Sequence, residues 1–217
     1  MIIPEQLVAL PHLLIADSAH FTVHSTIFTR TYVGDVLFGL TPVSTILIED
    51  AFTQGVVSIS TTLLSLPIAY PYTSHSIISA SDLNGMVSLG LQDSSSPVPK
   101  FSEDLGMDVK DSVSLDSLSG SIWRNTPSSP FKGPSTNCHS KMKEGDCLRM
   151  EVNLDSTPRT VQFFVNGKSG DCFVSGLPAS VRIGFASPAE DTSFRIDRIT
   201  RLSQPTPITP EMIELKW

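Results

Sequence analysis

The stretch that decides the fold is EGDCLRMEVNLDSTPRTVQFFVNGK, residues 144–168. It contains two runs in which apolar and polar side chains alternate, joined by a short Pro-containing segment and closed by Asn-Gly. Because successive side chains of a β-strand point to opposite faces, each run predicts a strand with one buried face. The stretch therefore predicts an antiparallel hairpin that forms part of a hydrophobic core.

The register of this hairpin follows from its two apolar faces. Leu154 opposite Val161 would place both apolar sets on one side, with Thr157-Pro158 or residues 156–159 as an even-numbered loop. A slip of one residue would turn every apolar side chain to the wrong face. We therefore expect the Leu154–Val161 pairing.

A second turn is predicted at Asn166-Gly167, since both central positions of a type I′ turn need a positive φ. If Val165 pairs with Lys168, the same register sets Val161 opposite Cys172. Cys172 is then expected to point inward as a core thiol.

The rest of the chain has a similar pattern of short alternating runs between Pro, Ser, Gly and Asn, and 16 prolines indicate many turns. An all-β, two-sheet sandwich is predicted, with short helical turns at 4–10 and 210–215. The expected strands are 21–30, 55–64, 85–91, 112–115, 121–123, 147–154, 160–165, 172–174, 181–185 and 193–199.

Composition limits the function. The chain of 217 residues is long enough for one domain that buries roughly 70% of its unfolded surface. A net charge of −7 argues against nucleic acid, which clustered Lys and Arg would bind. No stretch reaches the ~20 apolar residues of a membrane span. A signal peptide would need basic residues near its start, and none precedes Arg30.

The three cysteines, Cys138, Cys147 and Cys172, are an odd number. They are expected to be ordinary reduced thiols, which favours a reducing, cytoplasmic setting. Their spacing with His139 does not suit a structural zinc site, where ligands are paired two to four residues apart. No metal or cofactor is predicted.

Four pieces of the chain, taken in order, resemble the SPRY domain family. EGDCLRMEVNLD followed by VQFFVNGK is similar to the family's acidic-Gly-Asp turn and its strands ending in Leu-Asp and Asn-Gly. The other pieces are MVSLGLQDSSSPVP (86–99), GSIWRNT (120–126) and SVRIGFASP (180–188). The resemblance covers roughly residues 20–202, which leaves 1–19 and 203–217 as N- and C-terminal extensions.

The resemblance implies a bent two-sheet antiparallel sandwich, similar to concanavalin-A-like lectins, that is not an enzyme. Such a module would bind a peptide or protein surface through loops at one edge. Carried over by position, the contact residues would be Pro99, Lys100 and Phe101, together with Ser187, Pro188 and Ala189. Trp123, Arg124 and Arg159 are added because aromatic and Arg side chains dominate binding hot spots.

Catalytic alternatives have less support in the sequence. No Gly-x-Ser-x-Gly elbow is present, and Ser119-Gly120-Ser121 lacks the framing glycine. A glycosidase needs two carboxylates across a groove, whereas Glu151 has only Arg149 and Asn153 as neighbours on its face, so a surface ion pair is expected. A carbohydrate-binding or glycoside-hydrolysing sandwich remains the alternative to protein binding, and a purely structural role is a third possibility.

Overall fold

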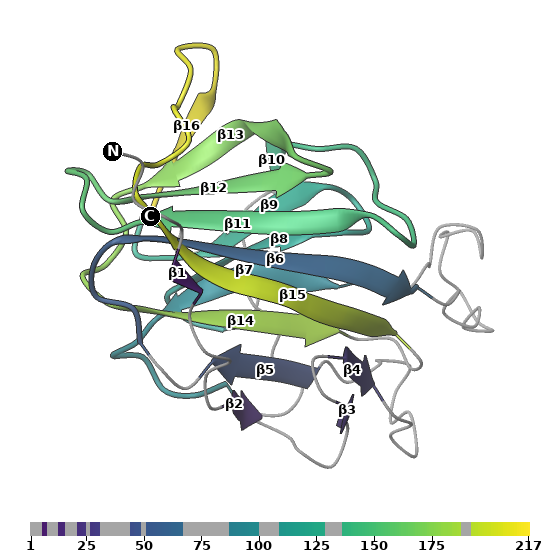
Figure 1. Cartoon of the computed structure of the whole chain (residues 1–217). Coiled ribbons are helices and arrows are strands. Elements are labelled where there is room, and N and C mark those ends of the chain that lie inside the picture. Colours follow the sequence, from purple (N-terminus) through teal and green to yellow (C-terminus); the bar gives the residue numbers. More distant parts are fainter. Residues whose placement is uncertain are drawn as a thin grey trace, which may run out of the picture.

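The structure is a computed structural model, and Figure 1 shows its arrangement. It describes residues 6–7, 13–15, 21–24, 27–30, 44–48, 51–66, 87–99, 109–128, 136–187 and 192–217. These residues form strands, turns and loops without a helix, and therefore none that could span a membrane. The all-β prediction is confirmed.

The larger sheet holds the decisive hairpin at its centre. Its order is β16-β13-β12-β11-β6-β15-β4-β3, and β1 pairs additionally with β15. The strands are β1 (Gln6–Leu7), β3 (Phe21–His24), β4 (Ile27–Arg30), β6 (Val56–Ser65), β11 (Cys147–Asn153), β12 (Thr160–Val165), β13 (Lys168–Ser175), β15 (Ser193–Leu202) and β16 (Ile213–Lys216).

The smaller sheet lies behind it in Figure 1 and has the order β10-β9-β8-β7-β14-β5-β2. Its strands are β2 (Leu13–Ile15), β5 (Ser44–Ile48), β7 (Ser88–Asp93), β8 (Ser112–Asp116), β9 (Ser121–Asn125), β10 (Thr136–Asn137) and β14 (Val181–Ser187). Described strand pairs are antiparallel in both sheets except for β13 and β16, which run parallel.

The core fills the space between the two sheets with aliphatic and aromatic side chains. Phe185 of β14 and Phe194 of β15 stack with ring centroids 4.8 Å apart, and both are fully buried. From the hairpin, Met150, Val161 and Phe163 contribute to the same core. The two sheets therefore meet through the faces that the alternating pattern predicts.

The register of the hairpin differs from the prediction by two residues. Val152, not Leu154, lies opposite Val161, and the connecting loop is residues 154–159. Because the shift is even, the predicted apolar side chains still face the core. The shift lengthens the loop without exchanging the two faces.

The second turn is confirmed, with Val165 opposite Lys168 and positive φ at Asn166 (51°) and Gly167 (78°). The register then shifts between Gln162 and Phe164, so that Val161 faces Val174 instead of Cys172. A β-bulge of this kind cannot be read from alternation alone, because the strand continues on both sides of it.

Three predicted elements are corrected. The predicted strand 21–30 is a hairpin of β3 and β4, whose Val23 and Phe28 are paired. Where the structure describes the two predicted helical turns it shows strands: Gln6–Leu7 pairs with β15, and residues 213–216 form β16. Both segments named as extensions thus contribute a strand to the larger sheet.

Candidate functional site

Loops from both sheets gather at one end of the sandwich, which we call the tail end. It consists of the loops 93–99, 125–128, 154–159 and 176–180 together with Trp217. The main chains of Phe52, between β5 and β6, and Val181 of β14 exchange hydrogen bonds of 2.8 and 3.0 Å at this end. The opposite end, which we call the turn end, consists of the turns 117–120, 143–146 and 166–167.

Loop 93–99 is fixed by hydrogen bonds from its own side chains and from its neighbours. The Asp93 carboxylate accepts from the Ser95 N–H and hydroxyl, both at 2.8 Å. Ser96 donates to Asp111 at 2.8 Å, and the Gln92 amide donates to the Pro97 carbonyl at 2.8 Å. A polar loop fixed in this way can present side chains at low entropic cost.

Val98 is a large aliphatic side chain that this loop exposes, with 40% of its surface accessible, and Ser95 and Pro97 are exposed beside it. Pro99, which was predicted as a contact residue, is buried. The neighbouring predicted residues Lys100 and Phe101 lie outside the described residues. Loop 93–99 therefore offers an apolar contact one residue before the position that the sequence favoured.

Two arginines at the tail end have buried donors without a hydrogen-bond partner among the described residues. One is the Nε of Arg159, a predicted contact residue, and the other is the Nε of Arg182. Arg182 lies opposite Gln92 in the sheet and donates from Nη1 to the Ser96 carbonyl at 3.4 Å. Buried unpaired donors are uncommon and costly, so each Nε would gain from an acceptor that reached it.

Trp123 and Arg124 lie on β9, and both are half-buried. Arg124 reaches across to the other sheet and donates to the Lys216 carbonyl at 2.7 Å, and burial lowers the pKa of its guanidinium. The Ser128 hydroxyl donates to the same carbonyl at 2.9 Å. Arg124, which was predicted as a contact residue, therefore binds main chain of this molecule.

Ser187 lies at the other end of β14 from Val181. It is fully buried and pairs with Ser44 of β5. Six residues of extended strand separate the two, which corresponds to about 20 Å. Its predicted partners Pro188 and Ala189 lie outside the described residues. The structure thus brings Pro99, Arg124 and Arg159 to the tail end, leaves Trp123 in the middle of β9 opposite Ser114, and places Ser187 far from them.

Sequence reasoning missed Val98, Arg182 and Ser128. Alternation along β14 gives no sign that Arg182 lies opposite Gln92 on the next strand. The Pro-Val-Pro sequence at 97–99 was the available signal for Val98, because a side chain held between two prolines is often presented on a loop.

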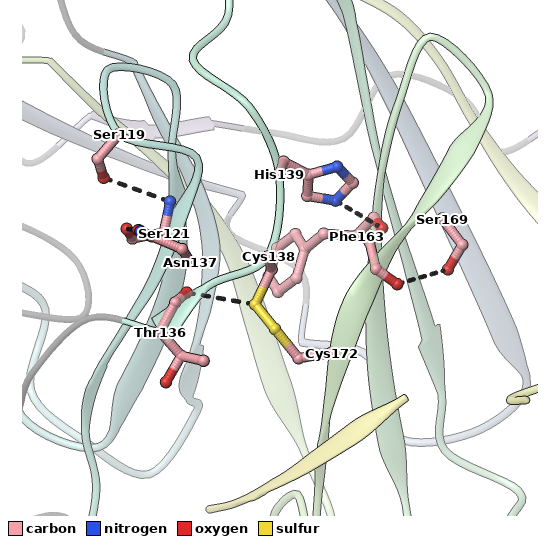
Figure 2. Close-up of a disulfide and its surroundings, with 10 residues drawn as sticks. Ser119, Ser121, Thr136, Asn137, Cys138, His139, Phe163, Ser169 and Cys172 are labelled. Carbon is pink, nitrogen blue, oxygen red and sulfur yellow. Dashed lines mark hydrogen bonds between the residues drawn. A yellow bond between two sulfur atoms is a disulfide. The ribbon is translucent and has the colours of Figure 1, made fainter. Parts of the chain in front are cut away.

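The prediction of free thiols is wrong for two of the three cysteines. Cys138, which follows β10, and Cys172 of β13 form a disulfide, with Cα atoms 5.5 Å apart (Figure 2). The bond joins the two sheets, and neither sulfur is available as a metal ligand or nucleophile. The reducing compartment, which was expected from the odd number of cysteines, stays a prediction.

His139 lies beside the disulfide with its ring against β13 (Figure 2). Its Nε2 donates to the Phe163 carbonyl at 3.2 Å. A Cβ at Gly170 would come within 2.4 Å of that nitrogen, so only glycine leaves room for the ring. Burial lowers the pKa of His139, although the Phe163 hydrogen bond and the charge of Asp171 raise it.

Cys147 is the remaining cysteine and is free. Burial raises the pKa of its thiol, and the nearby Asp197 carboxylate raises it further. A raised thiol pKa reduces the thiolate, which is the reactive form. No group of three or more His, Cys, Asp or Glu side chains that could hold a metal occurs in the described part of the chain.

Glu151 forms the expected ion pair with Arg149, whose Nη1 lies 2.7 Å from the carboxylate. It is not at the surface, however, because only 2% of its area is exposed. The Thr206 N–H and hydroxyl also donate to the carboxylate, at 2.5 and 2.9 Å. Both oxygens are therefore engaged with this molecule's own groups.

No protein-family model and no curated protein matches the chain. Several solved structures do. A human SPRY domain matches with a TM-score of 0.56 at 12% identity, covering 86% of this chain and 98% of that domain. The TRIM65 PSpry domain gives 0.54 at 13%, covering 88% and 90%. The chain has a SPRY-like fold.

The SPRY-like fold is shared with carbohydrate-binding proteins. The metal-free carbohydrate recognition domain of Emp46p matches with a TM-score of 0.54 at 12% identity, covering 89% of each chain. Since these identities are low, the likeness concerns the fold and not the ligand. The function must be argued from the residues of the site.

Proposed function

We propose that this SPRY-like domain is a non-catalytic protein-interaction module that binds an extended protein segment at its tail end. The observation that carries the proposal is the convergence there of a fixed loop with exposed Val98 and two arginines with buried, unpartnered Nε groups. An apolar anchor flanked by donors suits a peptide, whose main chain supplies one carbonyl per residue.

The chemistry at the tail end favours protein over sugar as the ligand. Arg124 and Ser128 already donate to a main-chain carbonyl, which shows that this surface can accommodate extended backbone. The carboxylate considered for glycoside chemistry, Glu151, is buried and engaged by Arg149 and Thr206. The SPRY neighbours support the same conclusion at the level of the fold.

The experiment is a selection from a displayed peptide library with the full chain, followed by affinity measurements on variants. Val98→Asp and Arg182→Ala should each weaken the selected peptides about tenfold or more, because hot-spot residues carry most of the binding energy. Ile213→Asp is the matched control, since Ile213 is also an exposed aliphatic residue but lies on β16 opposite Cys172.

Two results would contradict the proposal. One is that peptides selected by the wild-type chain bind Val98→Asp and Arg182→Ala as tightly as they bind Ile213→Asp. The other is that no peptide is selected while a glycan array gives specific binding, which would favour the carbohydrate-binding alternative.

A further inference from the structure

The last fifteen residues, 203–217, which we call the tail, are only partly integrated into the sandwich. After β15 the tail crosses the outer face of β11 and β12, where Gln162 donates to the Thr206 carbonyl at 2.8 Å. Thr206 and Met212 are half-buried, and the other residues of 203–212 are exposed. Figure 1 shows this segment reaching beyond β13 before it turns back as β16.

The tail ends as a strand added to the edge of β13. Cys172 lies opposite Ile213 and Ser175 opposite Lys216, and the Trp217 N–H donates to the Ser175 carbonyl at 2.9 Å. Addition of one extended segment to an exposed sheet edge is a common mode of peptide recognition, in which main-chain hydrogen bonds give affinity. Here the added strand is parallel, in contrast to the other described strand pairs.

Side-chain contacts select this particular segment. Leu215 is 7% exposed and belongs to the core, and Trp217 packs against the same core. On the opposite face, the Ser175 hydroxyl donates to Glu214 at 2.6 Å and lies 3.3 Å from the Lys216 ammonium. The side chain of Ile213 is 54% exposed and takes no part.

The groove is closed on its far side by the smaller sheet. Arg124 and Ser128 donate to the Lys216 carbonyl at 2.7 and 2.9 Å, which fixes the position of the strand along β13. The edge of β13, Ser175 and these two donors thus hold five residues of extended chain, and we call this place the β13 groove.

We infer that the β13 groove is a regulated peptide site whose present occupant, the tail, competes with a segment of a partner protein. The partner segment has the chemistry that the groove selects: it runs parallel to β13, with a leucine-like residue two positions before an aromatic one. This inference rests on the proposed function, and it adds a second, self-occupied peptide site beside the loop site, with a defined direction and sequence pattern.

The test uses a labelled synthetic peptide of residues 210–217, PEMIELKW, titrated against the full chain and measured by fluorescence anisotropy. In Leu215→Asp the tail should leave the groove, so the peptide should bind this variant roughly tenfold or more tightly than wild type, whose groove is rarely free. The matched control Ile213→Asp carries the same charge on the same strand and should behave like wild type.

Two further arms test specificity. A peptide with Asp in place of the leucine should bind none of the chains, and adding Arg124→Ala to Leu215→Asp should weaken the wild-type peptide. Equal binding of the peptide to Leu215→Asp and Ile213→Asp, with both chains folded by circular dichroism, would overturn the inference. The inference would also be overturned if wild type formed dimers and Leu215→Asp did not. In that case the competing occupant of the groove would be the tail of a second copy.

If Leu215→Asp does not fold, the inference is tested by the rates of amide hydrogen exchange in wild type. The amides of Leu215 and Trp217 should exchange about tenfold or more faster than those of β12, because the tail opens locally. Exchange of both sets at one common rate would overturn the inference. The proposed function is tested separately, by selecting peptides whose binding depends on Val98. If such peptides are selected and PEMIELKW does not bind, only the inference about the β13 groove fails. If PEMIELKW binds and no such peptide is selected, only the loop site fails.

Discussion

The turn end and the tail end of the sandwich are held together by different means. At the turn end, Asp116 accepts from the Leu118 N–H at 2.6 Å, Asn166 donates to Asp146 at 2.9 Å, and a disulfide joins the sheets nearby. At the tail end, hydrogen bonds from Arg124 and Ser128 to the Lys216 carbonyl link the smaller sheet to β16. A covalent link thus secures the fold near one end, and the proposed exchange of partners is placed at the other.

The largest effect is expected from the turn end. Replacing both Cys138 and Cys172 by Ala should lower the free energy of unfolding by about 2–4 kcal/mol, since a disulfide mainly restricts the unfolded chain. Denaturant unfolding in the absence of reductant measures the loss. Cys147→Ala is the control and should change stability far less. Equal losses in both variants would show that the disulfide does not secure this end.

A smaller effect is expected from the tail end. Arg124→Ala should cost about 1 kcal/mol, the net value of one hydrogen bond, because Ser128 still donates to the same carbonyl. Hydrogen exchange should show the loss of protection concentrated in β16, with the turn at 166–167 unchanged. Destabilisation as large as that of the disulfide variant, spread over both ends, would remove the difference between them.

The smallest effect is the pH dependence at His139, whose pKa is lowered by burial. As pH falls, the unfolded chain takes up this proton before the folded one does. The contribution to stability is therefore complete above the unfolded pKa of about 6.5 and is lost as pH falls through the lower folded value. His139→Gln should lose less stability than wild type between pH 7.5 and 5, as measured by urea unfolding. An identical pH profile would contradict this assignment.

The sequence predicts local structure well where a short turn links two alternating runs. Asn166-Gly167 fixes the pairing of Val165 with Lys168, and the faces of β11 and β12 are as expected. Beyond such turns the prediction fails, because alternation gives the face of a strand but not its partner. The parallel pairing of β13 with β16 and the approach of Cys138 to Cys172 both join segments more than thirty residues apart.

The site was predictable only in part for the same reason. Arg124 and Arg159 were named from residue type, and the topology brings them to one end. Ser187 lies at the other end because β14 runs the full length of the sheet between Val181 and Ser187. Two loops lie at the same end of the sandwich only if the strands between them have the right direction and length. The sequences of the loops themselves do not indicate this.

The disulfide also changes the covalent topology of the chain. Together with the backbone from Cys138 to Cys172 it closes a ring that contains all of β11 and β12 and part of β13. A single break of the backbone inside this ring would open it without releasing a fragment, because both pieces stay joined through sulfur. The hairpin that specifies the fold is thus also the part of the chain that cannot be lost by one cut.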